Sequence, residues 1–347
     1  MFYNDLTYLE DINNSIKNIE FPKDTSILIT GVSGLIGSFL VDALMTINEA
    51  REDNLKIYGL ARNVDNLGSR FSKYMNSNNL EFIKGNIIEG IPNEIEFDYI
   101  INLASNADPK NYALYPVETI LTNIRGTQNI LEYCKKHNKC RALLTSTFEV
   151  YGEVENGLDI KEEDYGMIDQ NVIRSGYPES KRVSELLVKS YVEEYKVDAL
   201  IVRLSSIYGP TMKFDDSKAA AQFIRNALKR ENIVLKSKGD QKRSYTYVSD
   251  CVQGILIALL HGTSGEVYNV SNPKSTISIA EFAKIVATES STDVVFDSPN
   301  FIETKGFGKK MDSVLSSQKL MELGYSPLYN AEKGIHNSIK ILKQKVK

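Results

Sequence analysis

Thr30-Gly31-Val32-Ser33-Gly34-Leu35-Ile36-Gly37 is the stretch of this chain that decides its fold. The residues before it, 26–30, form a short apolar run of the kind found in buried strands of parallel sheets. The residues after it, 38–45, predict a helix with Leu40 and Leu44 on one face. A strand, a glycine turn and a helix in this order are the context that a dinucleotide-binding fingerprint requires.

The three glycines of this stretch have separate expected roles. Gly31 permits a tight turn, Gly34 lets backbone N–H groups approach a pyrophosphate, and Gly37 lets the helix pack closely on the strand. The helix N-terminus directs the positive end of its dipole at the phosphates. The spacing is Gly-x-x-Gly-x-x-Gly rather than the more familiar Gly-x-Gly-x-x-Gly. The predicted cofactor site includes Gly31, Ser33, Gly34, Leu35, Ile36 and Gly37.

Length and composition indicate an ordinary soluble enzyme with a large α/β domain and a smaller lobe. The chain has 347 residues, of which 42% are hydrophobic and 25% are charged. A net charge of -4 argues against a nucleic-acid partner, and no apolar run is long enough to span a membrane. Three cysteines without framework spacing favour a reducing, cytoplasmic compartment. Cys134, His137 and Cys140 lie close together but lack a fourth ligand, so we expect no metal site.

Further strands are predicted at 56–62, 80–87, 98–105 and 141–147, and helical stretches such as 123–131 alternate with them. This alternation predicts an α/β fold, with a Rossmann-type doubly wound parallel sheet. Ligands of such sheets bind beyond the carboxyl ends of the strands. The residues expected beside the cofactor are Asn86, Ile87, Leu103, Ala104 and Ser105, and Ser146 and Thr147 lie where chemistry is expected.

The end of the second predicted strand bears on the choice between NAD and NADP. A carboxylate is expected there for NAD, because it accepts hydrogen bonds from the ribose hydroxyls. The strand instead ends in Ala61-Arg62, although Asp65 follows closely. A guanidinium suits the 2′-phosphate of NADP, so Arg62 favours NADP over NAD, but modestly.

Tyr177 and Lys181 are the residue pair that carries chemistry. They lie four residues apart, which places a phenol and an ammonium on one face of a helix. A free phenol, with a pKa near ~10, is a poor base at neutral pH, and a nearby ammonium would lower that pKa by roughly three units. Such a phenol can take a proton from a sugar hydroxyl while a hydride leaves for nicotinamide. A chance surface pair is the alternative, and the upstream glycine turn argues against it.

With these features the sequence resembles the short-chain dehydrogenase/reductase superfamily, in its extended nucleotide-sugar epimerase/dehydratase branch. The resemblance covers nearly the whole chain after residue 24. Besides the glycine turn and the Tyr177/Lys181 pair, it rests on Leu103-Ala104-Ser105, Asn123 with Gly126-Thr127, residues 146–152, Arg203 with Tyr208-Gly209-Pro210, residues 243–250, and Asp312-Ser313.

The resemblance implies a catalytic triad of Thr147, Tyr177 and Lys181, a tightly held cofactor that Asn123 also contacts, and transient oxidation at C4 of a nucleoside-diphosphate sugar. It implies a dinucleotide domain over 25–177. For the extension over 1–24 that precedes it, the helical spacing of Ile12, Ile16 and Ile19 predicts an amphipathic helix packed on that domain. The part from 178 to 347 mainly binds the nucleotide sugar, with segments that return to the first domain. The implied substrate contacts are Ser105, Ser146, Thr147, Ser206 and Arg243, with Arg243 at the diphosphate. A homodimer and a role in surface-polysaccharide biosynthesis are also implied.

Two departures from the family pattern bear on the reaction. Ser206 stands where the branch often has Asn, which affects one substrate contact. Residues 146–149 read Ser-Thr-Phe-Glu. The same stretch looks like Ser-Thr-Asp-Glu in hexose 4,6-dehydratases and like Ser-Thr-Ser-Glu in UDP-glucuronate decarboxylases, so Phe148 stands in the place of the Asp or the second Ser. Phe148 cannot donate a proton, whereas Glu149 is retained, either as a base at C5 or as a carboxylate that orients a hydroxyl.

These departures favour an epimerase or a decarboxylase. The alternatives that stay open are a 4,6-dehydratase, a one-way reductase of a 4-keto sugar, and a cofactor-binding scaffold without catalysis, since a fold alone never determines a function.

Overall fold

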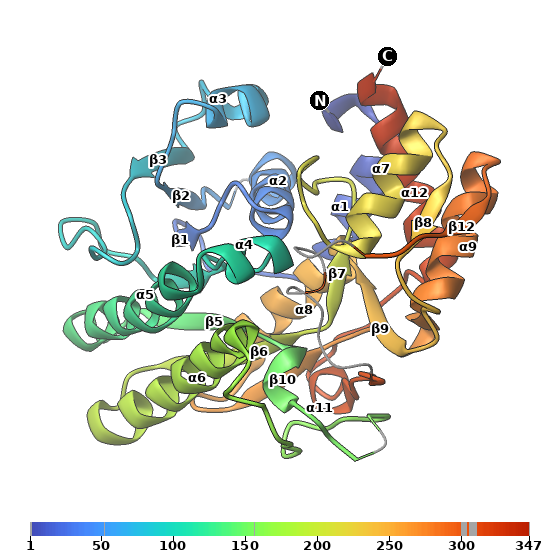
Figure 1. The fold of residues 1–347 in the computed structure, drawn as a ribbon. Coiled ribbons are helices and arrows are strands. Elements are labelled where there is room, and N and C mark those ends of the chain that lie inside the picture. The colour runs from blue at the N-terminus through green and yellow to red at the C-terminus, as the bar shows by residue number, and fades with distance from the viewer. Residues whose placement is uncertain (1, 52, 156, 300–303, 305–310, 347) are drawn as a thin grey trace.

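A sheet of seven parallel strands forms the centre of the larger lobe (Figure 1). The computed structural model describes residues 2–51, 53–155, 157–299, 304 and 311–346. The strand order is β10-β6-β5-β4-β1-β2-β3. The strands are β1 (Ser26–Thr30), β2 (Lys56–Ala61), β3 (Leu80–Lys84), β4 (Tyr99–Asn102), β5 (Arg141–Thr147), β6 (Ala199–Leu204) and β10 (Val267–Val270).

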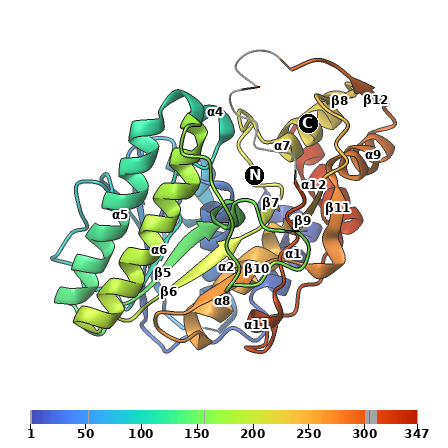
Figure 2. The same cartoon turned by 60° about the horizontal axis from the view of Figure 1, so that its bottom comes forward.

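Helices cover both faces of this sheet, as Figure 2 shows. Helices α2 (Leu35–Arg51) and α8 (Val248–His261) pack together on one face, and α5 (Pro116–Lys136) and α6 (Gly176–Tyr195) pack together on the other. Successive side chains of a strand point to opposite faces of the sheet. In β1, Ile27 and Ile29 therefore belong to one apolar core and Leu28 belongs to the other. The predicted doubly wound α/β class is therefore confirmed.

Two small sheets and three helices form the second lobe (Figure 1). Its sheets have the orders β11-β9-β7 and β12-β8. Its elements are β7 (Ser206–Tyr208), α7 (Ala219–Lys229), β8 (Ile233–Leu235), β9 (Lys242–Tyr247), β11 (Thr276–Ser278), α9 (Ile279–Ser290), β12 (Val294–Phe296) and α12 (Ala331–Val346). Because β6, α8 and β10 belong to the central layers, the chain passes repeatedly between the two lobes.

The N-terminal segment connects the lobes. It consists of a short 3-10 helix, η1 (Phe2–Asn4), and α1 (Leu6–Ser15), which contacts α2, α8 and α12. Asp11 of α1 is fully buried and accepts hydrogen bonds from Tyr247 at 2.5 Å and from Asn337 at 2.8 Å. The two chain ends consequently lie on the same side of the molecule (Figure 1).

Some element bounds differ from those predicted. The strand expected over 98–105 ends at Asn102, because the next residues leave the sheet and pass beneath the glycine turn. Helix α5 begins at Pro116 instead of Asn123, with the proline in the first turn where its missing N–H costs nothing. Helix α4 (Pro109–Leu114) was not predicted. In the part of the chain that the structure describes, no helix is long and apolar enough to cross a bilayer.

Candidate active site

The glycine turn lies between β1 and α2, and two of its glycines are sterically required. Gly31 has φ +68°, and a Cβ on it would lie 2.8 Å from the backbone carbonyl of Leu103. A Cβ on Gly37 would lie 2.5 Å from the carbonyl oxygen of Gly31. A Cβ on Gly34 would meet only that same oxygen, at 3.2 Å, so its other side is open for a ligand.

The ends of β1 and β4 are joined beneath this turn. Thr30 Oγ1 donates to Asn102 Oδ1 at 2.6 Å and accepts from the backbone N–H of Ala104 at 3.2 Å. These bonds hold Leu103 and Ala104 against Gly31. The predicted cofactor residues of both strands are therefore brought together.

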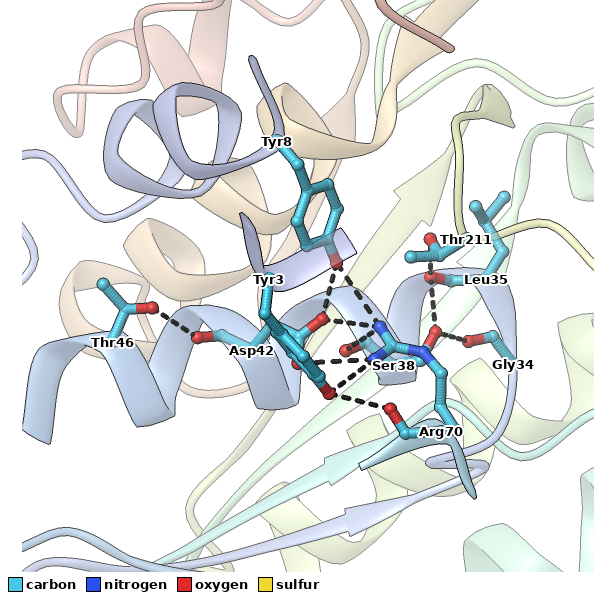
Figure 3. Close-up of polar contacts among 9 residues, drawn as sticks. All are labelled: Tyr3, Tyr8, Gly34, Leu35, Ser38, Asp42, Thr46, Arg70 and Thr211. Atoms are coloured by element: carbon cyan, nitrogen blue, oxygen red, sulfur yellow. Dashed lines mark hydrogen bonds and ion pairs between the residues drawn. The ribbon is translucent and has the colours of Figure 1, made fainter. Parts of the chain in front are cut away.

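A cleft of about 470 Å³ opens beside the turn. It is lined by Ser33 of the turn, by Asn63 and Arg70, and by residues 211–215 of the second lobe. Thr211 donates to the carbonyl oxygen of Leu35 at 2.7 Å, which fixes this lobe on the first turn of α2 (Figure 3). The open glycine backbone, the N-terminus of α2 and a polar cleft together fit a dinucleotide.

Arg62, predicted to select NADP, lies on the surface near this cleft but does not line it. Its side chain is 67% exposed and pairs with Glu118 at 2.8 Å. Arg70 lines the cleft instead. It pairs with the fully buried Asp42 at 2.5 Å, and Tyr3 and Tyr8 of the N-terminal segment surround it (Figure 3). The sequence contained no signal for Arg70, because its partners come from distant segments.

Asn123 was expected to contact the cofactor, but its amide already bridges two elements. It accepts from Ser105 Oγ at 2.8 Å and donates to Ser180 Oγ at 2.9 Å, and it is almost fully buried. It thus connects α5 to α6 and fixes Ser105 at the end of β4. The other two predicted contacts, Asn86 and Ile87, follow β3, and Ile87 packs against Gly126 of α5.

Tyr177, Thr147 and Glu149 lie together at the carboxyl end of β5. Burial raises the pKa of the Tyr177 phenol above its ordinary range, and the charge of Glu149 raises it further. A hydrogen bond with Thr147 opposes these two effects on the pKa of Tyr177. The structure therefore brings together three of the four predicted catalytic residues.

Lys181, the fourth, is buried on the same face of α6 as Tyr177. Its Nζ donates to the carbonyl oxygen of Thr145 at 2.8 Å, and burial lowers its pKa to about 8. Lys181 is not among the main effects on the pKa of Tyr177, so the expectation that it lowers this pKa stays a prediction. Desolvation dominates at the phenol, and the charges that act on it are those of Glu149 and Arg174.

Arg174 and Tyr112 are functional candidates that the sequence analysis missed. Arg174, in the 3-10 turn η4 (Ile173–Ser175), pairs with Glu149 at 2.8 Å, and each side chain is 17% exposed. It also donates to the hydroxyl of Tyr112 at 3.0 Å. The ring of Tyr112 stacks on Tyr177, with centroids 5.0 Å apart and planes 15° apart. Tyr112 comes from the unpredicted α4, so its proximity had no sequence signal.

The predicted substrate residues come from both lobes. Ser146 Oγ and Arg243 Nε are buried, and neither has a hydrogen-bond partner within the described ranges. The guanidinium of Arg243 lies 5.9 Å from the ring centroid of Phe148. Ser206 of β7 pairs with Tyr245 of β9, the strand that carries Arg243. The Ser146 hydroxyl and the Arg243 guanidinium are therefore candidates for binding a polar ligand near the end of β5.

Phe148 packs in a small apolar cluster with Tyr151, Ile160 and Leu315.

The cysteines near residue 137 show no ligand arrangement for a metal: Cys134 and Cys140 are 3.6 Å apart at sulfur, and His137 stacks on Tyr133. In the described residues no cluster of His, Cys, Asp and Glu could hold a metal ion.

Comparisons with known proteins agree with this geometry. The family model described as "NAD dependent epimerase/dehydratase family" matches residues 27–271. UDP-glucuronic acid decarboxylase 1 of Xenopus tropicalis is 33% identical over 316 residues, which cover 90% of this chain and 71% of the relative. UDP-glucuronic acid decarboxylase 6 of Arabidopsis thaliana is 37% identical over 267 residues, which cover 77% of this chain and 74% of the relative.

The fold has a solved counterpart in UDP-glucuronic acid 4-epimerase from Bacillus cereus, in complex with UDP-glucuronic acid and NAD. The TM-score is 0.77 at 24% identity, over 92% of this chain and 100% of the other.

Proposed function

Because the chain belongs to the NAD-dependent epimerase/dehydratase family, we propose that it modifies a nucleoside-diphosphate sugar through transient oxidation at C4. The observation that carries this proposal is the cluster of Thr147, Tyr177 and Glu149 beside the glycine turn, at the carboxyl end of β5. A hydroxyl, a phenol and a carboxylate converge there where ligands of such sheets bind.

Each residue has a definite role in this proposal. Tyr177 takes the proton of the C4 hydroxyl, and Thr147 donates a hydrogen bond to the same oxygen. Lys181 fixes the end of β5 through Thr145 and adds positive charge near the phenol. A dinucleotide held at the glycine turn would supply the hydride acceptor for the oxidation at C4 and the hydride donor for the later reduction.

We propose decarboxylation of a UDP-uronate as the reaction. Once C4 is a ketone, the C5–C6 bond breaks, its electron pair moves into the keto group as carbon dioxide leaves, and the resulting enolate takes up a solvent proton at C5. This step needs no acid at C6, and Phe148, which packs in an apolar cluster, offers none because a phenyl ring has no exchangeable proton. The similarity to UDP-glucuronic acid decarboxylases supports the same choice. Glu149, held by Arg174, then orients the sugar ring.

Epimerisation stays the second candidate, because Glu149 is also placed to exchange a proton at C5 of a 4-keto sugar. Dehydration is less favoured, since it needs an acid where Phe148 stands. A one-way reductase would consume the reduced dinucleotide stoichiometrically, and a scaffold would turn over nothing.

Proton NMR of the enzyme in D2O with UDP-glucuronate tests this choice, with UDP-glucose, TDP-glucose and GDP-mannose in separate tubes. We expect a UDP-pentose and carbon dioxide from UDP-glucuronate only. An uronate inverted at C4 would indicate epimerisation, and four unchanged spectra would contradict the proposed substrate class.

The cofactor preference, the substrate-binding lobe and the cellular location are further parts of the same proposal. Arg62 favours NADP, although its pairing with Glu118 means that a 2′-phosphate has to share or displace that carboxylate. The part from 178 onward, apart from the segments in the central layers, binds the nucleotide sugar, with Arg243 at the diphosphate. Three free, buried cysteines fit a cytoplasmic enzyme. A role in surface-polysaccharide biosynthesis follows from the family resemblance alone.

A further inference from the structure

Arg174 joins the two groups that flank Tyr177. Its Nη2 lies 2.8 Å from Glu149 Oε2 and 3.0 Å from the hydroxyl of Tyr112. The guanidinium carbon is 5.4 Å from the ring centroid of Tyr112, whose ring stacks in turn on Tyr177. One arginine therefore connects the carboxylate and the aromatic wall of the site.

The charges in this cluster act on the phenol in opposite directions. Five groups face Tyr177: Thr147 from β5, Glu149 from the turn that follows, Tyr112 from α4, Arg174 from η4, and Lys181 on its own helix. Glu149 raises the pKa of Tyr177, and Arg174 lowers it. Burial is the largest single effect on the pKa of Arg174 and lowers it, but Glu149 and Tyr112 together raise that pKa above its ordinary value.

A carboxylate beside a buried phenol opposes the reaction that Tyr177 has to perform. When the phenol loses its proton, two negative charges stand close together in a poorly solvated site. A fixed guanidinium on the carboxylate removes part of this repulsion. The pair is also nearly buried, so water screens it little.

We propose that Arg174 is a positioning residue, which holds Glu149 against Tyr112 and supplies the counter-charge that lets Tyr177 ionise beside the carboxylate. This inference rests on the proposed function. Arg174 lies outside the triad of Thr147, Tyr177 and Lys181, and its proposed role is to neutralise the charge of Glu149 rather than only to pack against it.

The test is the single-turnover oxidation of UDP-glucuronate by the cofactor-loaded enzyme, followed at 340 nm. We expect Arg174→Gln to slow this step by about tenfold and to raise its apparent pKa by about one unit. Arg174→Lys should recover most of the rate. In Glu149→Gln/Arg174→Gln the repulsion is gone, so the apparent pKa of the step should return to that of wild type, whereas the rate also reflects the loss of the carboxylate that orients the sugar.

Arg182→Gln is the matched control. Arg182 is 30% exposed in its side chain and bonds to the carbonyl oxygens of Val150 and Gly166, away from the phenol. We expect its oxidation rate and pH profile to match those of wild type. A double variant whose apparent pKa stays as high as that of Arg174→Gln, or an Arg174→Lys variant as slow as Arg174→Gln while still folded, would overturn the role of Arg174. Failure of the wild type to oxidise UDP-glucuronate would instead count against the proposed function.

Discussion

The position of Tyr177 was predicted from the sequence, but the main influences on the pKa of its phenol were not. Its i, i+4 spacing to Lys181 placed both groups on one helix face, and the apolar run of β5 placed Thr147 at a strand end. The pKa of the phenol depends instead on burial and on Glu149. Those contributions come from chain segments that no local pattern connects.

The first prediction at this scale concerns the phenol itself. Tyr177→Phe should lower turnover of UDP-glucuronate by about 10²–10⁴-fold, because the proton acceptor for the C4 hydroxyl is lost. The thermal midpoint should change little. Tyr191→Phe is the control, since Tyr191 lies on the same helix and bonds to Glu132 at 2.5 Å, far from Thr147. Unchanged turnover in Tyr177→Phe would revive the scaffold alternative.

The second prediction concerns cofactor selection. Arg62→Ala should weaken NADPH binding by about 10- to 100-fold, the value of a lost charge-assisted bond, and leave NADH binding unchanged. Glu118→Gln should strengthen NADPH binding, because it releases Arg62 from its ion pair. Fluorescence titration of both reduced cofactors measures these affinities. Equal changes for the two would show that Arg62 does not contact a 2′-phosphate.

At the scale of elements, apolar runs predicted the central strands well, because a strand buried on both faces has few polar residues inside it. Segments β1 and β5 begin and end where predicted. Helices α4 and the first two turns of α5 were missed, although Pro109 and Pro116 mark their first turns. Their sequences mix polar and apolar residues without a clear apolar face, so these segments are helical because they pack on neighbouring elements.

Helix α1 gives a prediction on stability and pH. Burial raises the pKa of Asp11 to about 6, although bonds from Tyr247, Tyr329 and Asn337 oppose the shift. Because the folded pKa exceeds the unfolded value of about 3.9, folding favours the protonated form. This contribution is complete below about pH 4 and is lost as the pH rises through 6.

The free energy of unfolding of the wild type should therefore fall between pH 4 and 7, and that of Asp11→Asn should fall by about 2 kcal/mol less over the same range. The amide can keep both hydrogen bonds, since the hydroxyl of Tyr247 can also accept. Urea unfolding at a series of pH values measures the difference. Glu10→Gln, which removes a neighbouring charge from the same helix, is the control. Parallel pH profiles for wild type and Asp11→Asn would contradict the argument.

At the scale of the whole molecule, the sequence predicted the doubly wound sheet but not how the lobes meet. Arg243 was expected at the substrate from family resemblance alone. Its place near Phe148 is a long-range contact between β9 and the turn that follows β5. The polar contacts of the N-terminal segment were likewise beyond sequence analysis, because Asp42 and Arg70 meet Tyr3 and Tyr8 only in the folded chain.

Assembly is tested at the same scale. Exposed apolar side chains gather on α5, α6 and the segment before them, namely Leu114, Tyr115, Val117, Val183, Leu186 and Tyr195. We propose that this surface forms a homodimer. Leu186→Glu, at a side chain that is 64% exposed, should convert the dimer to a monomer in light scattering, whereas Leu328→Glu on the other lobe should not. A monomeric wild type would contradict the proposal.

The central claim is that oxidation and reduction occur at the same carbon within one active site. Mass spectrometry of the product from UDP-glucuronate deuterated at C4 tests it most directly. We predict that the pentose product keeps the deuterium at C4 and that no reduced dinucleotide is left when the reaction is complete. Loss of the label from the product, or one equivalent of reduced dinucleotide per turnover, would contradict transient oxidation.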